Sequence, residues 1–523
     1  MATDGSMTRS HEGRLAGERW TSALAVAAYF ALAKLLIHFL TSGRYGYFRD
    51  ELYYLACGEH LDWGYVDHAP LVGLVARLSR ELFGDSLFAI RLFPALAGAL
   101  KVLLTGLIAR ELGGRRLAVA LACLCVLIAP VYLVADYLLS MNAFEPLFWM
   151  GAAYAIILVI KRQEPRYWLL FGLLAGLGLE NKHSMLFFGF GIFVGLLVTP
   201  ARRALFSKWF WLGGALAASI FLPNLIWEYR HDWATIELLA NVGKTGKNVR
   251  LSPLEFVGQQ ILIMHPLTAP VWLAGLWFLL FDGAGRRYRP LGVAYLVVLS
   301  MLILLKGKNY YLQPVYPMLF AGGGVLFERL CGRRYFGWLK IAYPLLLLIG
   351  GALLAPLALP LLPVETFLQY ERALGIEPPK TEVGHQGALP QHFGDQFGWP
   401  EMVAEVARIY HSLPPEERAR AGIYANNYGE AGAIDFFGSR YGLPKAVSPH
   451  QSYFLWGPRG VTGEVLILLQ SKRADAERLC SSVEEAAVLN HPYAMAEERY
   501  RIFICRDLKR PLAEIWPKLK HWN

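Results

Sequence analysis

The sequence predicts a polytopic α-helical membrane protein with a small C-terminal α/β domain. Of the 523 residues, 55% are hydrophobic and 18% are charged, whereas a soluble protein carries about 25% charged residues. The mean hydropathy is +0.35. Apolar runs such as 23–40, 117–135 and 209–227 are long enough to cross a hydrocarbon core of about 30 Å. After residue 365 the content of proline, histidine and charge rises.

Eleven apolar stretches are candidate membrane spans. They are residues 22–42, 87–109, 117–136, 139–160, 166–181, 183–199, 209–227, 260–281, 290–306, 310–328 and 337–362. The predicted transmembrane domain therefore covers residues 1–363, with a first outer loop at about 43–86, and residues 364–523 form the second domain.

The connections between these spans alternate in basic content. Arginine and lysine precede the first span and follow every second span from the second to the tenth. These residues are Arg9, Arg14, Arg19, Arg110, Arg115, Arg116, Lys161, Arg162, Arg166, Arg202, Arg203, Lys208, Arg286, Arg287, Arg289, Arg329, Arg333 and Arg334. Because positive charge marks the cytoplasmic side, the N-terminus is predicted inside and the C-terminal domain outside. The formal charge of +10 thus orients the protein, and nucleic-acid binding is not expected.

The first apolar stretch is either a retained anchor or a cleaved signal peptide. A basic segment precedes it, as in a signal peptide. Its apolar run is longer than a usual signal core, contains Lys34, and is followed by no convincing small-residue cleavage site before Tyr45. The retained anchor is therefore favoured, and it places the next connection outside.

A carboxylate pair, Asp50 and Glu51, follows the first span in the motif RDELYY. Ionisable groups at or inside a bilayer are rare and usually functional. An isolated Asp at the start of a short helix, here predicted over 50–60, is more often a cap. The adjacent Glu51, the flanking Tyr53 and Tyr54, and the GYVDHAPL turn favour an acid/base site instead.

Other polar residues gather in the predicted outer connections. They are Asp67, His68, Asp136, Glu180, Lys182, His183, Glu228, His231, Asp232, Lys306, Lys308, Tyr310 and Tyr311. The inner connections are mostly Arg, Gly and Pro turns, so chemistry or binding is predicted on the outer face. Apolar residues at helical spacing over 71–83 predict an amphipathic helix at the membrane interface, and a helix packed on the bundle gives the same pattern.

Cationic residues at the outer ends of the spans predict a phosphate site. Arg91 begins the second span, Lys182 ends the fifth, and Lys308 follows the ninth. Each alone is more typical of an interfacial anchor. Together they suit phosphate, because lysine acts as a charge clamp and arginine as a bidentate fork. Tyr310 and Tyr311 fit either an aromatic belt or a sugar pocket.

Inside the fourth span, Glu145 follows Asn142 by one turn in SMNAFEPLFW. An intramembrane carboxylate is a functional candidate, although a hydrogen-bonded structural role fits equally. The cysteines lack zinc-ligand spacing; Cys480 and Cys505 both fall in the outer domain, and their pairing stays open. No P-loop or dinucleotide fingerprint occurs, so a soluble nucleotide is not expected as donor.

The C-terminal domain is predicted to alternate short strands with helices. The strands are 422–425, 465–469 and 500–505, and the helices lie near 400–411, 429–437 and 473–480. Glu430, Asp435 and His450 are its polar candidates, and Glu430 fits a first-turn helix charge equally well.

Five motifs within residues 25–330 resemble the GT-C superfamily of membrane glycosyltransferases, family 39-like, which includes the protein O-mannosyltransferases and the lipid A aminoarabinose transferases. They are RDELYYLACGEHLDWGYVDHAPL, FAIRLFPALAG, SMNAFEPLFW, LGLENKHSM and KGKNYYLQPVYPML. The resemblance implies a GT-C-like fold. It also implies inverting transfer of a sugar from a polyprenyl-phosphate donor to an envelope lipid, glycan or protein. The site would face the outside of the bacterial cytoplasmic membrane.

The resemblance also implies roles for particular residues. Asp50 matches the catalytic position and would act as base toward the acceptor hydroxyl, or orient it, with Glu51 in support. The donor-phosphate candidates are Arg91, Lys182 and Lys308, and the pocket candidates are Asp67, His68, Asp136, Asn142, Glu145, Tyr310 and Tyr311. Enzymes of this kind differ in their use of a divalent metal ion, so a metal cofactor remains open.

The chain departs from the family in the fourth span, where many members carry an acidic residue and this sequence has Asn142. A second acidic role would then fall to Glu145 or to Asp136. The alternative function is a transporter or flippase of a lipid-linked sugar. Such a protein would show internal repeats and polar groups facing both sides, whereas no persuasive repeat occurs and the polar groups favour one side.

Overall fold

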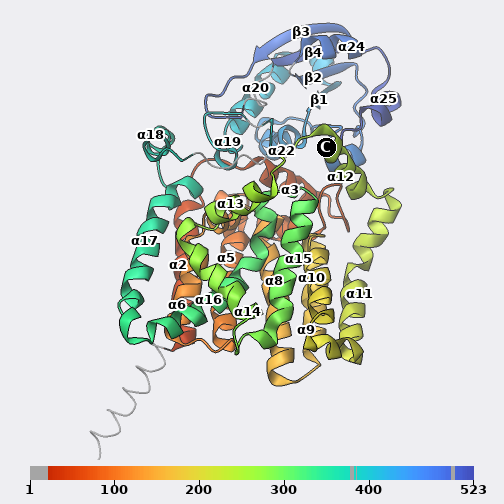
Figure 1. Cartoon of the computed structure of the whole chain (residues 1–523). Helices are drawn as coiled ribbons and strands as arrows, with labels where there is room; N and C mark the ends of the chain where they lie inside the picture. The colour runs from red at the N-terminus through yellow and green to blue at the C-terminus, as the bar shows by residue number, and fades with distance from the viewer. Residues whose placement is uncertain (1–21, 377–381, 385, 471, 496–500) are drawn as a thin grey trace, which may run out of the picture.

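The structure is a computed structural model that describes residues 22–376, 382–384, 386–470, 472–495 and 501–523. A bundle of helices forms one end of the molecule, and a small sheet with its flanking helices covers the other end (Figure 1). The connecting helices α3 (Arg49–Glu59) and α12 (Ala234–Thr245) lie at the same end as the sheet. The polytopic helical fold with a smaller α/β part, predicted from the sequence, is confirmed.

Six helices among the described residues are long and apolar enough to cross a membrane, and three bent helix pairs raise the number to nine. The six are α2 (Ala23–Thr41), α5 (Leu87–Glu111), α8 (Met141–Arg162), α11 (Lys208–Arg230), α15 (Arg289–Leu304) with the turn before it, and α17 (Leu339–Ala358) with the turn before it. The pairs are α6 (Arg116–Ile128) with α7 (Pro130–Tyr137), α10 (Met185–Leu197) with η1 (Pro200–Phe206), and α13 (Pro253–Ile263) with η2 (Pro266–Thr268) and α14 (Ala269–Leu280).

The predicted number of eleven spans is not confirmed. The two predicted spans outside this set are α9 (Tyr167–Asn181) and α16 (Tyr316–Cys331). They contain 15 and 16 residues and rise about 23 and 24 Å, less than a hydrocarbon core of about 30 Å. The predicted stretch 166–181 matches α9 to within one residue, and the predicted stretch 310–328 begins in a separate short helical turn over residues 309–315 that precedes α16.

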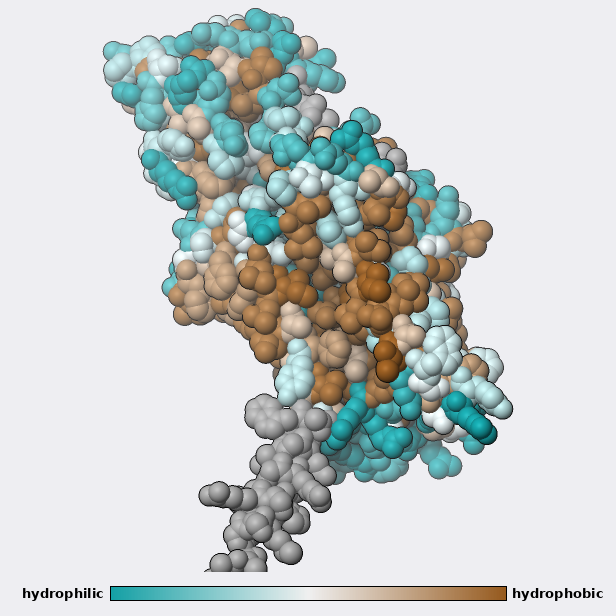
Figure 2. Space-filling view, turned by 90° about the vertical axis from the view of Figure 1, so that its left-hand side faces the viewer, coloured by the Kyte–Doolittle hydropathy of each residue, from teal (hydrophilic) through white to brown (hydrophobic). Residues whose placement is uncertain are grey.

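The surface of the bundle carries a broad apolar belt between polar ends (Figure 2). The outer helices α2, α11 and α17 contribute exposed leucines such as Leu32, Leu222 and Leu345. Contiguous exposed apolar surface of this extent marks a surface that is covered by something other than water. With the spans above, the belt shows a multi-pass membrane protein.

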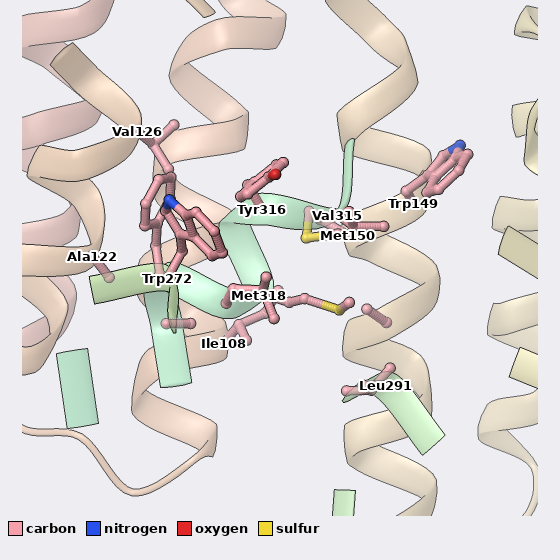
Figure 3. Packing of buried hydrophobic residues seen from close by; sticks show 14 of the residues in the cluster. Ile108, Ala122, Val126, Trp149, Met150, Trp272, Leu291, Val315, Tyr316 and Met318 are labelled. Carbon is pink, nitrogen blue, oxygen red and sulfur yellow. The ribbon is translucent and has the colours of Figure 1, made fainter. Parts of the chain in front are cut away.

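Inside the bundle, aromatic and aliphatic side chains from several helices interlock (Figure 3). Trp272 of α14 and Tyr316 of α16 meet edge to face with 5.5 Å between ring centroids. A Cβ on Gly275 would lie 1.8 Å from the Leu319 carbonyl oxygen, so only glycine permits this approach. Close approach of membrane helices depends on such small residues. The α14–α16 contact fixes η4 (Asn309–Val315), the segment that enters the site.

The four-stranded sheet has the order β1-β2-β4-β3. Its strands are β1 (Ala421–Tyr424), β2 (Val465–Gln470), β3 (Cys480–Val488) and β4 (Arg501–Leu508). β1 and β2 are parallel, and the other pairs are antiparallel. The three predicted strands are confirmed. β3 was missed because it is a mostly exposed edge strand whose sequence, CSSVEEAAV, shows no apolar alternation.

A disulfide joins Cys480 at the start of β3 to Cys505 in the neighbouring β4. This resolves the pairing that the sequence left open. The other four cysteines are buried and free.

Further helices lie outside the bundle, and those predicted near 50–60, 71–83, 400–411, 429–437 and 473–480 are among them. α3 (Arg49–Glu59) and α4 (Leu71–Phe83) occupy the first long connection, and α12 (Ala234–Thr245) lies beside the C-terminal end of the chain (Figure 1). Towards the C-terminus come α18 (Val364–Leu374), α19 (Gln391–Gly394), α20 (Trp399–Ser412), α21 (Pro415–Arg418), α22 (Tyr428–Phe437), α23 (Gln451–Trp456), α24 (Arg473–Leu479) and α25 (Leu512–Leu519). α4 buries Val72 and Ala76 and exposes Leu74, Leu78 and Leu82, as expected of an amphipathic helix.

One apolar core joins the first connection to the C-terminal segment. It contains Leu52 of α3, Phe144 of α8, Val403 of α20, Ile434 of α22 and Ile467 of β2. α22 therefore packs against α3, although the two helices are far apart in the sequence. The division between residues 363 and 364 stays a prediction, since it separates parts that share this core.

Candidate active site

Asp50 lies in the first turn of α3 and lines the main cavity. Its Oδ1 accepts a hydrogen bond of 2.8 Å from the hydroxyl of Tyr428 in α22. Burial raises the pKa of Asp50 above its ordinary value, while Tyr428 and the neighbouring Arg49 offset part of that rise. A carboxylate whose pKa is raised toward neutral pH suits a general base.

Glu51 has a different environment from Asp50. Its Oε2 accepts the amide of Phe48, the residue that caps α3, at 2.8 Å. The Arg91 guanidinium donates to both of its oxygens, at 2.9 and 2.8 Å, and the amide of Leu139 donates at 2.9 Å. The Glu51 side chain therefore bonds back to the N-cap amide of this helix, and its lone pairs are occupied.

Arg91 is 1% exposed and makes further contacts besides Glu51. Its guanidinium donates to the carbonyl of Ser42 at 2.9 Å, to that of Gly46 at 2.8 Å and to the hydroxyl of Tyr137 at 2.5 Å. These contacts tie α5 to the start of α3. Because these contacts occupy the Arg91 guanidinium and bury it, Arg91 is not available to bind the donor phosphate as predicted.

The cavity has a volume of about 760 Å³ and joins a polar end to an apolar wall. Asp50, Asn142, Lys308, Tyr310 and Glu382 line its polar end. Side chains of three helices make the apolar wall; they are Val131 and Val134 of α7, Leu262 and Ile263 of α13, and Leu354 and Leu357 of α17. The cavity therefore combines charged groups beside Asp50 with an apolar lining.

Lys308 is the cation that lines the polar end. Its Nζ contacts the Glu382 carboxylate at 2.5 Å. Burial opposes its charge, but Tyr310, Tyr311 and Glu382 outweigh that effect and raise its pKa above the ordinary value. Lys308 therefore stays cationic.

Lys247 lies close to the same group. Its backbone carbonyl accepts the amide of Val383 at 2.9 Å, which holds the loop after α12 against the segment carrying Glu382. Burial, together with the nearby charges of Arg49 and Lys308, lowers the pKa of Lys247 below its ordinary value, and Glu382 and Asp50 offset part of that shift. Together with Arg49, Lys247 surrounds the two carboxylates with positive charge.

Lys182 forms a second polar group with two other predicted residues. Its Nζ donates to Asn142 at 2.8 Å and to Glu145 at 2.9 Å. It also lies over the Tyr311 ring, 4.4 Å from the centroid. The structure thus brings Lys182, Asn142, Glu145 and Tyr311 together, and Asn142 connects this group to the cavity.

The remaining predicted pocket residues do not line the cavity. Asp67 accepts a hydrogen bond of 2.8 Å from Tyr53, and His68 is buried with its Nδ1 2.9 Å from the Ala69 carbonyl. Asp136 lies in α7, where Lys34 and Lys101 bind its carboxylate at 3.0 and 2.7 Å.

The polar candidates of the C-terminal domain have local partners. Glu430 accepts from the amide of Asn426 at 2.7 Å, which agrees with the first-turn interpretation. Asp435 pairs with Arg459 at 3.0 Å.

Four residues near Asp50 escaped the sequence analysis, namely Arg49, Lys247, Glu382 and Tyr428. Three of them come from connections or from the C-terminal segment, far from Asp50 in sequence. Arg49 begins the motif RDELYY, and the signal for Tyr428 was the motif NNYGEAGAI, whose closely spaced glycines indicate a tight approach. Across the described ranges, no group of three or more His, Cys, Asp or Glu side chains is placed to hold a metal ion.

Comparison with known proteins supports the sequence-based resemblance. Residues 67–227 match the family model of dolichyl-phosphate-mannose-protein mannosyltransferases. A curated relative, the lipid A galacturonosyltransferase RgtD of Rhizobium johnstonii, is 29% identical over 266 residues. The match covers 49% of this chain and 53% of the relative, so the chain spans about half the length of that protein.

Two solved structures share the fold. ArnT from Cupriavidus metallidurans in the apo state gives a TM-score of 0.59 at 16% identity, and the same protein bound to undecaprenyl phosphate gives 0.61 at 15%. Each comparison covers 91% of this chain and 97% of ArnT. The agreement therefore includes the bundle and most of the C-terminal segment.

Proposed function

We propose that this chain transfers a sugar from a polyprenyl-phosphate donor to an envelope lipid, a proposal supported by the glycosyltransferase family match over residues 67–227 and by the lipid A galacturonosyltransferase relative. The acceptor we infer is a lipid of the lipid A class, the substrate named for the RgtD relative. The carrier we infer is undecaprenyl phosphate, which one ArnT structure contains.

The cavity beside Asp50 is the observation that carries the proposal. Its apolar wall suits a polyprenyl chain, and its polar end presents a carboxylate and a lysine to the head group. An amphiphilic donor would therefore place its phosphate and sugar beside Asp50.

In the proposed reaction, Asp50 acts as general base. Its carboxylate takes the proton of the acceptor hydroxyl as the acceptor oxygen attacks the anomeric carbon. The new glycosidic C–O bond forms while the bond from that carbon to the phosphate oxygen breaks, with inversion. Polyprenyl phosphate leaves with the bonding electron pair, and Asp50 releases its proton to water.

The leaving phosphate gains negative charge during this step, so fixed positive charge near it lowers the barrier. Lys308, which lines the cavity, is the proposed contact, with Lys247 and Arg49 adding charge nearby. Lys182, already bound by Asn142 and Glu145, is proposed to position the sugar-binding side of the pocket.

Replacing Lys308 by methionine is expected to raise the KM for the lipid donor about tenfold, which corresponds to about 1.4 kcal/mol of binding, with a smaller effect on kcat. The matched control is Lys306→Met, since Lys306 is exposed in the same turn. Steady-state kinetics in nanodiscs at varied donor concentration provide the measurement. Equal KM values for the two variants would contradict the role of Lys308.

The proposed topology places the N-terminus in the cytoplasm and the site outside. The disulfide Cys480–Cys505 supports it, because disulfides persist in oxidising compartments and are rare in the cytosol. The alternating basic connections support the same orientation.

The function is tested with purified protein in liposomes that contain undecaprenyl-phosphate-linked sugars and lipid A. Mass spectrometry of the lipids after incubation is expected to show lipid A heavier by one sugar residue and free undecaprenyl phosphate. Movement of the donor across the bilayer without any new glycosidic product would instead indicate the flippase.

A further inference from the structure

The hydroxyl of Tyr428 contacts Asp50 and has no role in the reaction proposed above. It donates to Asp50 Oδ1 at 2.8 Å from a helix 378 residues further along the chain. Burial raises the pKa of the Tyr428 hydroxyl well above its ordinary value. The phenol therefore stays protonated and acts as the donor in this bond.

The start of α22 is built so that Tyr428 holds one position. The Asn427 side chain caps the helix by accepting the amides of Gly429 at 2.8 Å and Glu430 at 3.0 Å. Glu430 in turn accepts from the Asn427 side-chain amide at 2.7 Å. The bonds accepted by Asn427 satisfy free backbone amides at the start of the helix. Together with the bond from Asn427 to Glu430, they fix the backbone that carries Tyr428.

Two glycines bring α22 directly onto α3. A Cβ at Gly432 would lie 2.8 Å from the carbonyl carbon of Leu52, and one at Gly429 would lie 2.6 Å from the Arg49 side chain. The closely spaced glycines of NNYGEAGAI are thus required for Tyr428 to reach Asp50.

The Tyr428 ring is also enclosed by other side chains. His450 stacks on it with 4.9 Å between centroids at 17°, and Tyr53 packs at 4.7 Å. The Arg49 guanidinium lies 5.1 Å from its centroid. The ring cannot turn its hydroxyl away from Asp50 without displacing these neighbours.

We infer that Tyr428 is a positioning residue for the reaction: the C-terminal segment orients Asp50 and stabilises its carboxylate form through this hydroxyl. The inference rests on the proposed function of Asp50 as base. Its consequence is that the site is assembled from both ends of the chain.

The test measures the protonation of Asp50 directly. Other titratable or charged groups around it are Arg49, Tyr54, Asp67, His68, Lys247, Lys308, Tyr310 and Glu382, and they are left unchanged. The carboxyl band of Asp50 in pH-difference infrared spectra is identified by its loss in Asp50→Asn. Its midpoint is then compared between the wild type, Tyr428→Phe and Tyr453→Phe.

Tyr453→Phe is the matched control, because Tyr453 is a buried tyrosine whose hydroxyl donates to a different carboxylate, Asp435, at 3.1 Å. Loss of a hydrogen bond to a charged group is expected to raise the Asp50 midpoint by about one pH unit in Tyr428→Phe. In the control the midpoint stays at its wild-type value. The acidic limb of the kcat/KM profile should move upward by the same amount.

An unmoved Asp50 midpoint in Tyr428→Phe overturns the inference. If that variant does not accumulate, 3,5-difluorotyrosine at position 428 replaces it; this stronger donor should lower the midpoint, and an unchanged midpoint again overturns the inference. The infrared titration needs no turnover. A shifted midpoint without any sugar transfer therefore rejects the proposed function and keeps the Tyr428–Asp50 coupling.

Discussion

Replacing Asp50 by asparagine is expected to lower sugar transfer at least a hundredfold while the protein stays folded. The amide keeps the size of the side chain but cannot take the proton of the acceptor hydroxyl, and a positioned base contributes about 10²–10⁴ in rate. The measurement is the initial rate of lipid glycosylation in nanodiscs, together with the melting temperature of each variant.

The control for this substitution is Asp85→Asn. Asp85 lies in the same connection between α2 and α5, but its carboxylate is 53% exposed and pairs with Arg80 at 2.6 Å. We expect near wild-type transfer from that variant. Wild-type transfer by Asp50→Asn would remove Asp50 from the mechanism and leave the cavity without an identified base.

The second large effect is expected from Arg91→Met. The variant leaves Glu51 as a buried charge that has lost both of its guanidinium bonds, and breaking a buried pair in this way costs about 3–5 kcal/mol. Thermal unfolding in detergent, followed by circular dichroism, measures the loss. Because the damage lies in the unpaired charge, Arg91→Met combined with Glu51→Gln should lose less than the sum of the single variants.

The comparison for Arg91 is the pair Arg77–Glu81 on α4, whose side chains are 44% and 53% exposed. Exposed pairs contribute about 0–1 kcal/mol, so Arg77→Met should unfold close to the wild-type temperature. Equal melting temperatures for Arg77→Met and Arg91→Met would contradict the structural role given to Glu51 and Arg91.

Local patterns predicted the helices well because each membrane helix satisfies its own backbone and needs an apolar sequence. The short helices α3 and α4, the three more apolar strands and the helices between them also carried recognisable local signals. β3 did not, since an exposed edge strand requires no apolar alternation. The start of α16 was placed too early because residues 309–315 form the separate short helix η4.

The candidate site was predictable only where one segment carried the chemistry. Asp50, Lys308 and Tyr310 do line the cavity, and each stands in or beside a motif. The sequence could not separate Glu51 from Asp50, because their difference depends on Arg91 reaching back from α5. Nor could it indicate that the C-terminal segment supplies Tyr428, since such a contact depends on tertiary packing alone.

The apolar core shared by α3, α8, α20, α22 and the sheet has a practical consequence for dividing the chain. A protein cut after residue 363 would expose Leu52 and its buried neighbours on α3 to water, and a separate 364–523 fragment would carry the matching uncovered face. Each fragment would expose an apolar surface that is buried in the intact chain. The change in composition near residue 364 therefore marks a change of surroundings from lipid to water. The smallest unit that folds cooperatively includes residues on both sides of it.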